Sequence, residues 1–599
     1  MATDAIGFAG DLLDDSKFQH ILVKEMRALL ISGFREVSFR WGSQGFLCTL
    51  VLIGTAFLVV YPLLAIVVIS FETSQPGELL SYSLTGWQSA FQSPAIVQSI
   101  LTTLHLTWWR QIIAMPVALL FVWLIARTDL PGRDYLEFTF WVAFFLPTLT
   151  VVQGYLLMFD PQYGIVNKLL AKLPFFGPST IDIYSFHGII FAHLATNAIS
   201  APILLLTPVF RNMDASLEEA AQVSGSSVVG TFLRITIPLM APGVLVVFLL
   251  STIRAMETFE IEMFLGAPKN IYVYSMQVYD LVRSNPPRFS TAAALSVMVL
   301  LLIAPLVIAQ MLVTRKSFTT VGSRYRAKII RLGAWRRPAF ALVAGTALFT
   351  TVVPTLLLFV GTLMELWGFF DLPNPWTLRH WETVLSDPIF IRSLLNTVTI
   401  ATGVALLGVV WGFIVAYIVV RTRFRARYVL DFVSWLPFAL PGVILGLGFL
   451  SLFLGVVFFR PMYGTVLMLI VALTVSAITS KIQVLRSNLV QIHGELEEAA
   501  RAAGNSWLGG IRTVTVPLVF RGVLVVGILG FMSASRNVSI VALLSSSSNR
   551  PLSMLQLDYL TEGRYEAAAV VGTILVLLTV VVAFLVRVLG FRKGVQTSE

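Results

Sequence analysis

The chain has 599 residues, of which 57% are hydrophobic and 12% are charged, and its formal net charge is +10. A soluble protein cannot bury that much apolar surface, so the composition excludes a soluble enzyme and a soluble binding module. Lys and Arg gathered on one side of a membrane explain the positive charge, and nucleic acid is not an expected partner.

The first 45 residues are polar and mixed, and they lack the pattern of a cleaved signal peptide. We expect residues 1–45 to form a cytoplasmic extension. Within it, 17–41 fits either an amphipathic helix on the membrane surface or a poorly ordered tail. The single cysteine, Cys48, lies in the first apolar run, which excludes a disulfide framework within the chain.

Twelve long apolar runs follow, and they predict an all-α membrane protein with about twelve transmembrane helices. The runs cover residues 46–70, 100–126, 136–159, 186–210, 239–261, 291–314, 340–364, 394–420, 429–458, 464–485, 518–545 and 566–591. We therefore expect a first repeat at 46–314, a basic cytoplasmic linker at 315–339, a second repeat at 340–592 and a short tail at 593–599.

Lys and Arg residues follow the second, eighth and twelfth runs and fill the linker, as at Arg127, Arg421 and Arg592. With twelve spans these segments all fall on one side, which the positive-inside rule assigns to the cytoplasm. Both chain termini are then expected in the cytoplasm.

The two halves of the sequence resemble each other. Leu146-Pro147 recurs as Leu440-Pro441, and Arg127-Thr128 recurs as Arg421-Thr422, each 294 positions later. Six spans separate equivalent points, and six is even, so both halves have the same orientation. This pattern predicts two parallel six-helix repeats that enclose a central path.

A polar signature occurs once in each half, and the two copies are 279 positions apart. The first, within 211–238, contains Glu219, Ala220, Ala221, Gly225 and Pro238. The second, within 487–517, contains Glu498, Ala499, Ala500, Gly504 and Pro517. Ala and Glu favour a helix, and glycine at the next turn ends it in a left-handed conformation. A second short helix is expected before the proline, which opens the next span. Such a rigid projection suits docking to a soluble partner.

The paired Glu-Ala-Ala…Gly…Pro pattern resembles the EAA loop of binding-protein-dependent ABC importer permeases, over nearly all of residues 46–592. The resemblance implies that these loops dock on a cytosolic ATPase. The coupling residues would be Glu219, Ala220, Gly225, Pro238, Glu498, Ala499, Gly504 and Pro517. The chain contains no Gly-x-x-x-x-Gly-Lys-Ser/Thr phosphate loop. We therefore expect two copies of a separate ABC ATPase to bind ATP and Mg²⁺, with no cofactor and no catalytic residue in this chain.

The resemblance also implies a bacterial inner-membrane location and a periplasmic or lipid-anchored substrate-binding protein as partner. Residues 126–133, 316–321 and 332–336 resemble ferric-iron permeases, with thiamine permeases as close relatives. Ferric iron is the expected substrate, and thiamine, a phosphonate, a sugar phosphate or a polyamine stay alternatives. An ion-gradient-driven secondary transporter is the alternative class, and a non-transporting scaffold or enzyme is the least supported.

Charges near the end of the fifth span are the candidate path residues: Arg254, Glu257 and Glu260, with Arg536 at the equivalent place in the second half. We expect Glu257 and Arg536 to pair as a gate near the external mouth, where carboxylates would also suit a passing ferric ion. The alternative is that they sit at the external water boundary without a specific role. Lys481 is expected to extend to the cytoplasmic interface. The spacing of the histidines, His193 among them, predicts no metal site.

Overall fold

The computed structural model describes residues 43–72, 81–173, 181–214, 216–315 and 329–590. Within these ranges the regular structure is helical, and β pairing is limited to three isolated bridges. Nine described helices are long and apolar enough to cross a membrane, and three bent helix pairs raise the number to twelve. The predicted all-α membrane fold is confirmed. Residues 17–41, for which a surface helix or a poorly ordered tail was expected, lie outside the described residues, as do most of the linker and the tail.

The first half contains six membrane-spanning elements, of which the third and fourth are bent pairs. They are α3 (Ser43–Ile69), α5 (Pro94–Arg127), α6 with α7 (Arg133–Phe145 and Thr148–Phe159), α9 with α10 (Phe186–His193 and Ser200–Arg211), α13 (Ile237–Ala255) and α15 (Phe289–Arg315).

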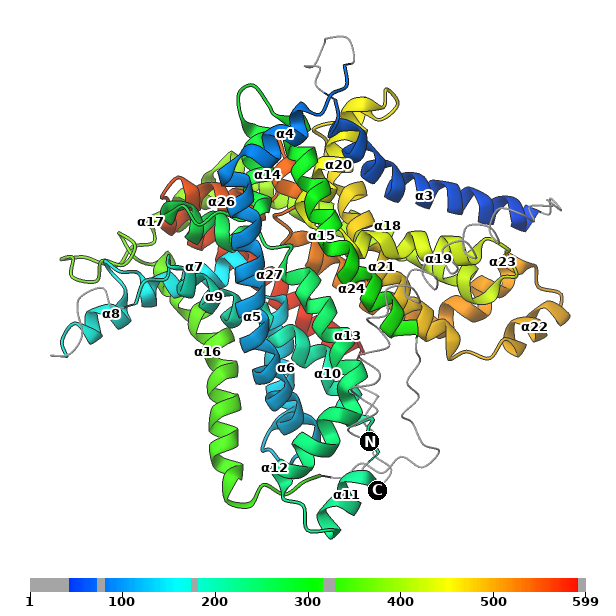
Figure 1. Ribbon diagram of the computed structural model, residues 1–599, viewed down its shortest axis with the longest axis horizontal. Helices are drawn as coiled ribbons and strands as arrows, with labels where there is room; N and C mark the ends of the chain where they lie inside the picture. The colour runs from blue at the N-terminus through cyan, green and yellow to red at the C-terminus, as the bar shows by residue number, and fades with distance from the viewer. Residues whose placement is uncertain (1–42, 73–80, 174–180, 215, 316–328, 591–599) are drawn as a thin grey trace.

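The second half repeats this order with one bent pair. Its elements are α16 (Arg336–Thr362), α18 (Pro388–Arg421), α19 with α20 (Arg427–Trp435 and Gly442–Gly455), α21 (Val466–Val490), α24 (Val516–Ser535) and α27 (Tyr565–Gly590). Four short helices lie toward the upper left of Figure 1, namely α4 (Thr85–Gln92), α14 (Tyr274–Arg283), α17 (Arg379–Ser386) and α26 (Leu552–Thr561).

The third span of each half breaks at the repeated Leu-Pro pair. The chain turns by 101° between α6 and α7 and by 114° between α19 and α20. Leu146 and Leu440 are both extended. Proline disfavours the helical conformation in the residue before it and has no N–H to donate. The repeated Pro147 and Pro441 therefore give both halves a free helix end inside the protein.

The first helix of each sequence half packs against the other half. Helix α16 contacts α6 and α7, whereas α3 contacts α19 and α20. In Figure 1, α16 runs beside the first half at the lower left, and α3 lies beside the second half at the upper right. Each of these helices also contacts the last helix of its own half, α16 with α27 and α3 with α15, so both lie across the boundary between the two halves.

The largest part of the hydrophobic core joins the two halves. The largest cluster combines Tyr155 and Phe259 of the first half with Phe449 and Leu555 of the second. Two smaller clusters belong to separate bundles: the first arm, built by α5, α6, α10, α13 and α16, and the second arm, built by α3, α18, α19, α21 and α24. The arms diverge toward the lower and right sides of Figure 1, so a space opens between them.

Candidate coupling loops and central cavity

Each signature lies at the tip of one arm (Figure 1). The loops consist of α11 (Ser216–Val223) with α12 (Val228–Thr231), and of α22 (Glu495–Ala502) with α23 (Trp507–Gly510). The glycines between them, Gly225 and Gly504, have φ angles of +87° and +90°. A side chain on either glycine would meet no atom within 4 Å. The left-handed backbone, and not lack of space, therefore requires glycine here.

Hydrogen bonds after the glycines fix the turns. The N–H of Ser226 binds the carbonyl of Ala221 at 2.9 Å, and the N–H of Asn505 binds that of Ala500 at 3.1 Å. These six-to-one bonds are those of a Schellman cap. Two distant stretches of sequence thus build the same rigid turn.

A π-helical turn follows in both loops, at Phe232–Thr236 and at Ile511–Thr515. The helix continues through it into the span, which begins near Val229 in one half and near Trp507 in the other. Pro238 and Pro517 stand in the first turn of α13 and α24, as predicted, although the apolar helical stretch begins before them. The N–H groups that close the π turns come from the residues before the prolines, and a proline has no N–H that needs a partner.

A buried ion pair fastens the first loop to its arm. Arg127, at the end of α5, donates to the Glu218 carboxylate, and both side chains are almost fully buried. Arg127 also donates to the carbonyl of Met213 at 3.1 Å, and Thr236 donates to Glu218 Oε1 at 2.7 Å. These contacts link the loop helix α11 to the π turn that follows it and to the end of α5, so we expect the three to move together.

The second loop has the same attachment in a more exposed form. Arg421 Nε lies 3.5 Å from Glu497 Oε1, and the two side chains are 14% and 12% exposed. Glu497 also accepts hydrogen bonds from Thr515 at 2.9 Å and from Tyr417 at 3.0 Å. Glu219 and Glu498 are the predicted coupling residues, but the buried attachments are made by the neighbouring Glu218 and Glu497. A sequence signal for these pairs existed, because both the arginines (Arg127 and Arg421) and the glutamates recur in the two halves.

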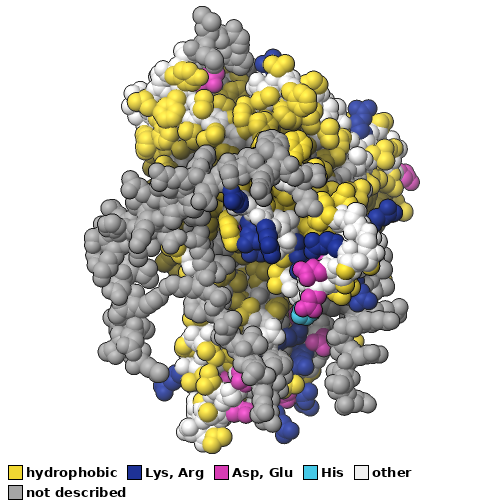
Figure 2. Space-filling view, turned by 90° about the vertical axis from the view of Figure 1, so that its right-hand side faces the viewer, with side chains coloured by type: hydrophobic (Ala, Val, Ile, Leu, Met, Phe, Trp, Pro, Cys, Tyr) yellow, Lys and Arg dark blue, Asp and Glu magenta, His cyan; other side chains and the backbone are white. Residues whose placement is uncertain are grey.

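The predicted coupling residues lie on the outer side of the loops. Ala220, Gly225, Pro238, Glu498, Ala499, Gly504 and Pro517 are exposed, and Glu219 is half-buried. Figure 2 shows the face with the second loop, where most charged side chains gather in its middle and lower parts and hydrophobic ones cover the top. The exposed residues are available to a partner, while Glu218 and Glu497 hold the loops from within.

A cavity of about 510 Å³ lies between the two arms. The predicted path residues Arg254, Glu257, Glu260 and Arg536 all line it, which brings residues from both halves to one place. Arg110 and Lys481 line it as well. Among the described residues, no group of three or more His, Cys, Asp or Glu is placed to hold a metal ion.

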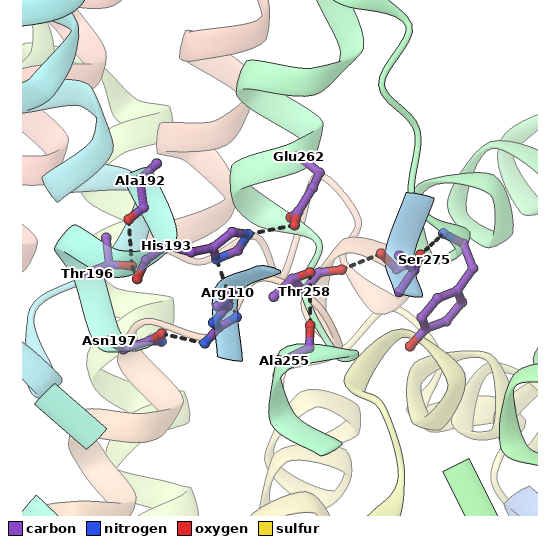
Figure 3. A network of polar contacts seen from close by, with 11 residues as sticks. Arg110, Ala192, His193, Thr196, Asn197, Ala255, Thr258, Glu262 and Ser275 are labelled. Carbon is purple, nitrogen blue, oxygen red and sulfur yellow. Dashed lines mark hydrogen bonds and ion pairs between the residues drawn. The ribbon is translucent and has the colours of Figure 1, made fainter. Parts of the chain in front are cut away.

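A polar network crosses the first arm beside this cavity (Figure 3). His193 Nε2 lies 2.7 Å from Glu262 Oε1, and Arg110 donates to His193 Nδ1 at 3.4 Å and to Asn197 Oδ1 at 3.1 Å. Because Nδ1 accepts from Arg110, the imidazole carries its proton on Nε2 and is neutral. The network ties α5, the fourth span and the segment after α13 together.

The comparisons with known proteins agree with this architecture. Residues 408–595 match the family model of the binding-protein-dependent transport system inner membrane component. A ferric transport system permease protein FbpB from Actinobacillus pleuropneumoniae is 26% identical over 589 residues, which are 93% of this chain and 80% of that protein. A putative FbpB 1 from Haemophilus influenzae is 26% identical over 84% of this chain and 78% of its own length. The second half of the chain therefore contains a domain of the binding-protein-dependent inner membrane component family, and the chain as a whole is similar to ferric transport permeases.

A solved bacterial ABC transporter that imports the acidic polysaccharide alginate is also similar, with 17% identity and a TM-score of 0.39 over 50% of this chain and 100% of that one. The permease is a multi-pass inner-membrane protein by its apolar helices and its relatives. The family name includes the dependence on a substrate-binding protein.

The predicted pair of Glu257 and Arg536 does not form in the permease. Glu257 pairs with Arg254 at 2.5 Å, and its Oε1 accepts the N–H of Gly442 at 3.0 Å. Gly442 begins α20, where the break at Pro441 leaves N–H groups without helical partners. A carboxylate at a helix N-terminus satisfies such a donor and opposes the positive end of the dipole.

Arg536 makes the complementary contact in the opposite direction. It donates to the carbonyls of Phe144 at 2.6 Å and Leu146 at 3.3 Å, where α6 ends before Pro147. A cation suits the negative end of that helix. Glu257 and Arg536 occupy equivalent positions, and each reaches the broken helix of the other half. Their opposite charges follow from the opposite helix ends that they meet.

The prediction for Lys481 was also wrong. Its side chain is 3% exposed and donates to the carbonyl of Val404 at 2.8 Å, instead of extending to the interface. Two glycines make room for it: a methyl group on Gly408 would lie 1.9 Å from Lys481 Nζ, and one on Gly530 would lie 3.1 Å away. The absence of side chains at Gly408 and Gly530 leaves the space that the Lys481 side chain fills.

Proposed function

We propose that this permease forms the translocation path of an ATP-driven importer of ferric iron, and that its two loops couple the path to two cytosolic ABC ATPase subunits. The duplicated loops, each fastened to its arm by Arg, Glu and Thr, carry the coupling part of this proposal. The names of the relatives, which are ferric transport permeases over most of this chain, support the substrate.

Coupling requires that motion at the loop reach the path without being absorbed. Thr236 is at once in the π turn and in contact with Glu218, and Thr515 has the same relation to Glu497. A displacement of α11 or α22 therefore moves the following span directly. The chain itself has no phosphate loop, so ATP and Mg²⁺ would bind to the partner subunits, on the cytoplasmic side where both chain termini would lie.

The test is the uptake of radiolabelled ferric iron in cells that express the full chain, its deletion, or the double variant Gly225→Val with Gly504→Val. Gly563→Val is the matched control, because Gly563 has φ of +77° and open space around it but lies outside both loops. We expect uptake to fail in the deletion and the double variant and to persist in the control.

Three outcomes would revise the proposal. Iron uptake that survives the deletion would exclude ferric iron and direct the search to thiamine, a phosphonate, a sugar phosphate or a polyamine. Uptake that persists in the double variant would exclude coupling through the loops. Uptake that collapses with the ion gradient while ATP is held constant would favour a secondary transporter.

A further inference from the structure

We propose that Lys481 and Arg110 form an anion-binding site in the central cavity, where the permease accepts an oxyanion, either free or as the ligand shell of a ferric ion. This inference rests on the proposed importer function and deepens it. A charged side chain within a membrane span is costly unless it faces a cavity or a partner, and functional sites are where such charges persist.

The surroundings of Lys481 are built to hold an ammonium group at the cavity. The residue extends from α21 between α18 and α24, in the slot left by Gly408 and Gly530. An ammonium has three N–H donors, and within the described residues its hydrogen bond is the one to the carbonyl of Val404. A group of the cargo can therefore accept from the remaining donors without displacing a carboxylate.

Arg110 brings a second cation to the same cavity. Its side chain is 7% exposed, and its partners, His193 and Asn197, are both neutral. Its Nε is buried and has no hydrogen-bond partner within the described structure. The carboxylate of Glu262 lies on the far side of His193, so the imidazole stands between it and Arg110.

The carboxylates that line the cavity are already engaged. Four basic side chains line it against two carboxylates, those of Glu257 and Glu260. Glu257 is held by Arg254 and by the N–H of Gly442, and Glu260 interacts with Arg536 and the backbone of Val538. The cations left without a carboxylate in contact are Arg110 and Lys481. A bare cation would meet net repulsion there, whereas an anion would gain charge-assisted hydrogen bonds.

The test measures binding of citrate, of ferric citrate and of spermidine to the purified full-length permease in lipid nanodiscs by titration calorimetry. We expect both anions to bind, spermidine not to compete, and Lys481→Met to weaken anion binding by about tenfold or more. Methionine has a similar unbranched shape and fits the slot. The control Lys168→Met removes the same charge from an exposed position and should leave binding unchanged.

Gly408→Ala gives a second test that does not touch the charge. The added methyl group would displace the ammonium, so it should weaken citrate binding in the wild type and have no further effect in Lys481→Met. Failure of the wild type to bind either citrate or ferric citrate, or equal binding in Lys481→Met and Lys168→Met, would overturn the anion site. Binding of ferric citrate but not citrate would assign the site to the ligand shell. If citrate binding depends on Lys481 but cells that lack the chain still take up iron, the anion site stands and ferric iron is refuted as the substrate.

Discussion

The two halves of the chain match each other closely at the loop ends of the arms but not at the cavity ends. At the loops, both halves use an arginine from the second span, a glutamate on the loop helix and a threonine in the π turn. Beside the cavity, Arg110, His193 and Glu262 have Val404, Ala472 and Val541 at the equivalent positions, and Lys481 has Pro202. Coupling needs the same motion in both halves, whereas a path needs only one set of contacts with its cargo.

The first loop attachment should show the largest effect. Glu218→Gln leaves Arg127 buried without a carboxylate, and we expect a loss of about 3 kcal/mol in stability with loss of transport. Glu497→Gln breaks the more exposed pair with Arg421, and we expect it to lower the free energy of unfolding by about 1 kcal/mol. Thermal unfolding of the purified chain measures both. Equal losses would show that the difference in burial between the two attachments has no energetic weight.

Breaking the network beside the cavity should come next. His193→Ala removes the hydrogen-bond partner of Glu262 Oε1, and a stability loss of about 2 kcal/mol is expected. His187→Ala, at an exposed position, is the control. Adding Glu262→Leu to His193→Ala should restore part of the loss, because the unpaired carboxylate is gone. If the double variant is no more stable than His193→Ala, Glu262 does not need its histidine.

The glycine turns test whether the loops are equivalent. Gly225→Val forces a branched side chain into the left-handed region and should cost about 1–2 kcal/mol, with a matching cost for Gly504→Val. Gly225→Asn should cost clearly less, since asparagine visits that conformation. Unfolding measurements on the four proteins, wild type included, give the comparison. If the asparagine variant is as unstable as the valine variant, the requirement for glycine comes from its lack of a side chain and not from its φ angle.

The smallest effect is expected at the cavity end of the fifth span. Glu257→Gln keeps an amide oxygen for the N–H of Gly442 and loses a partly exposed ion pair, so about 0.5 kcal/mol is expected. Arg536→Gln should cost more, because the guanidinium serves two carbonyls and lies over the rings of Phe144 and Phe145. Stability and iron uptake of both variants provide the test. Equal effects of the two variants would mean that the different helix ends contacted by Glu257 and Arg536 make no difference to stability.

The sequence alone determined the features that depend on local composition. Apolar runs predicted twelve spans, which the described residues form as nine long helices and three bent pairs, and the repeated Glu-Ala-Ala…Gly pattern predicted the two glycine turns. These follow from rules that act within a few residues, such as the length needed to cross a bilayer and the φ angle that glycine permits.

Tertiary structure decided which distant groups meet. No local rule shows that α3 and α16 pack against the opposite half, that Glu257 reaches α20 while Arg536 reaches α6, or that Lys481 turns inward between Gly408 and Gly530. A charge in a span has several favourable positions, at the interface, at a helix end or at a cavity. The choice among them depends on which unsatisfied backbone groups the packed helices leave within its reach.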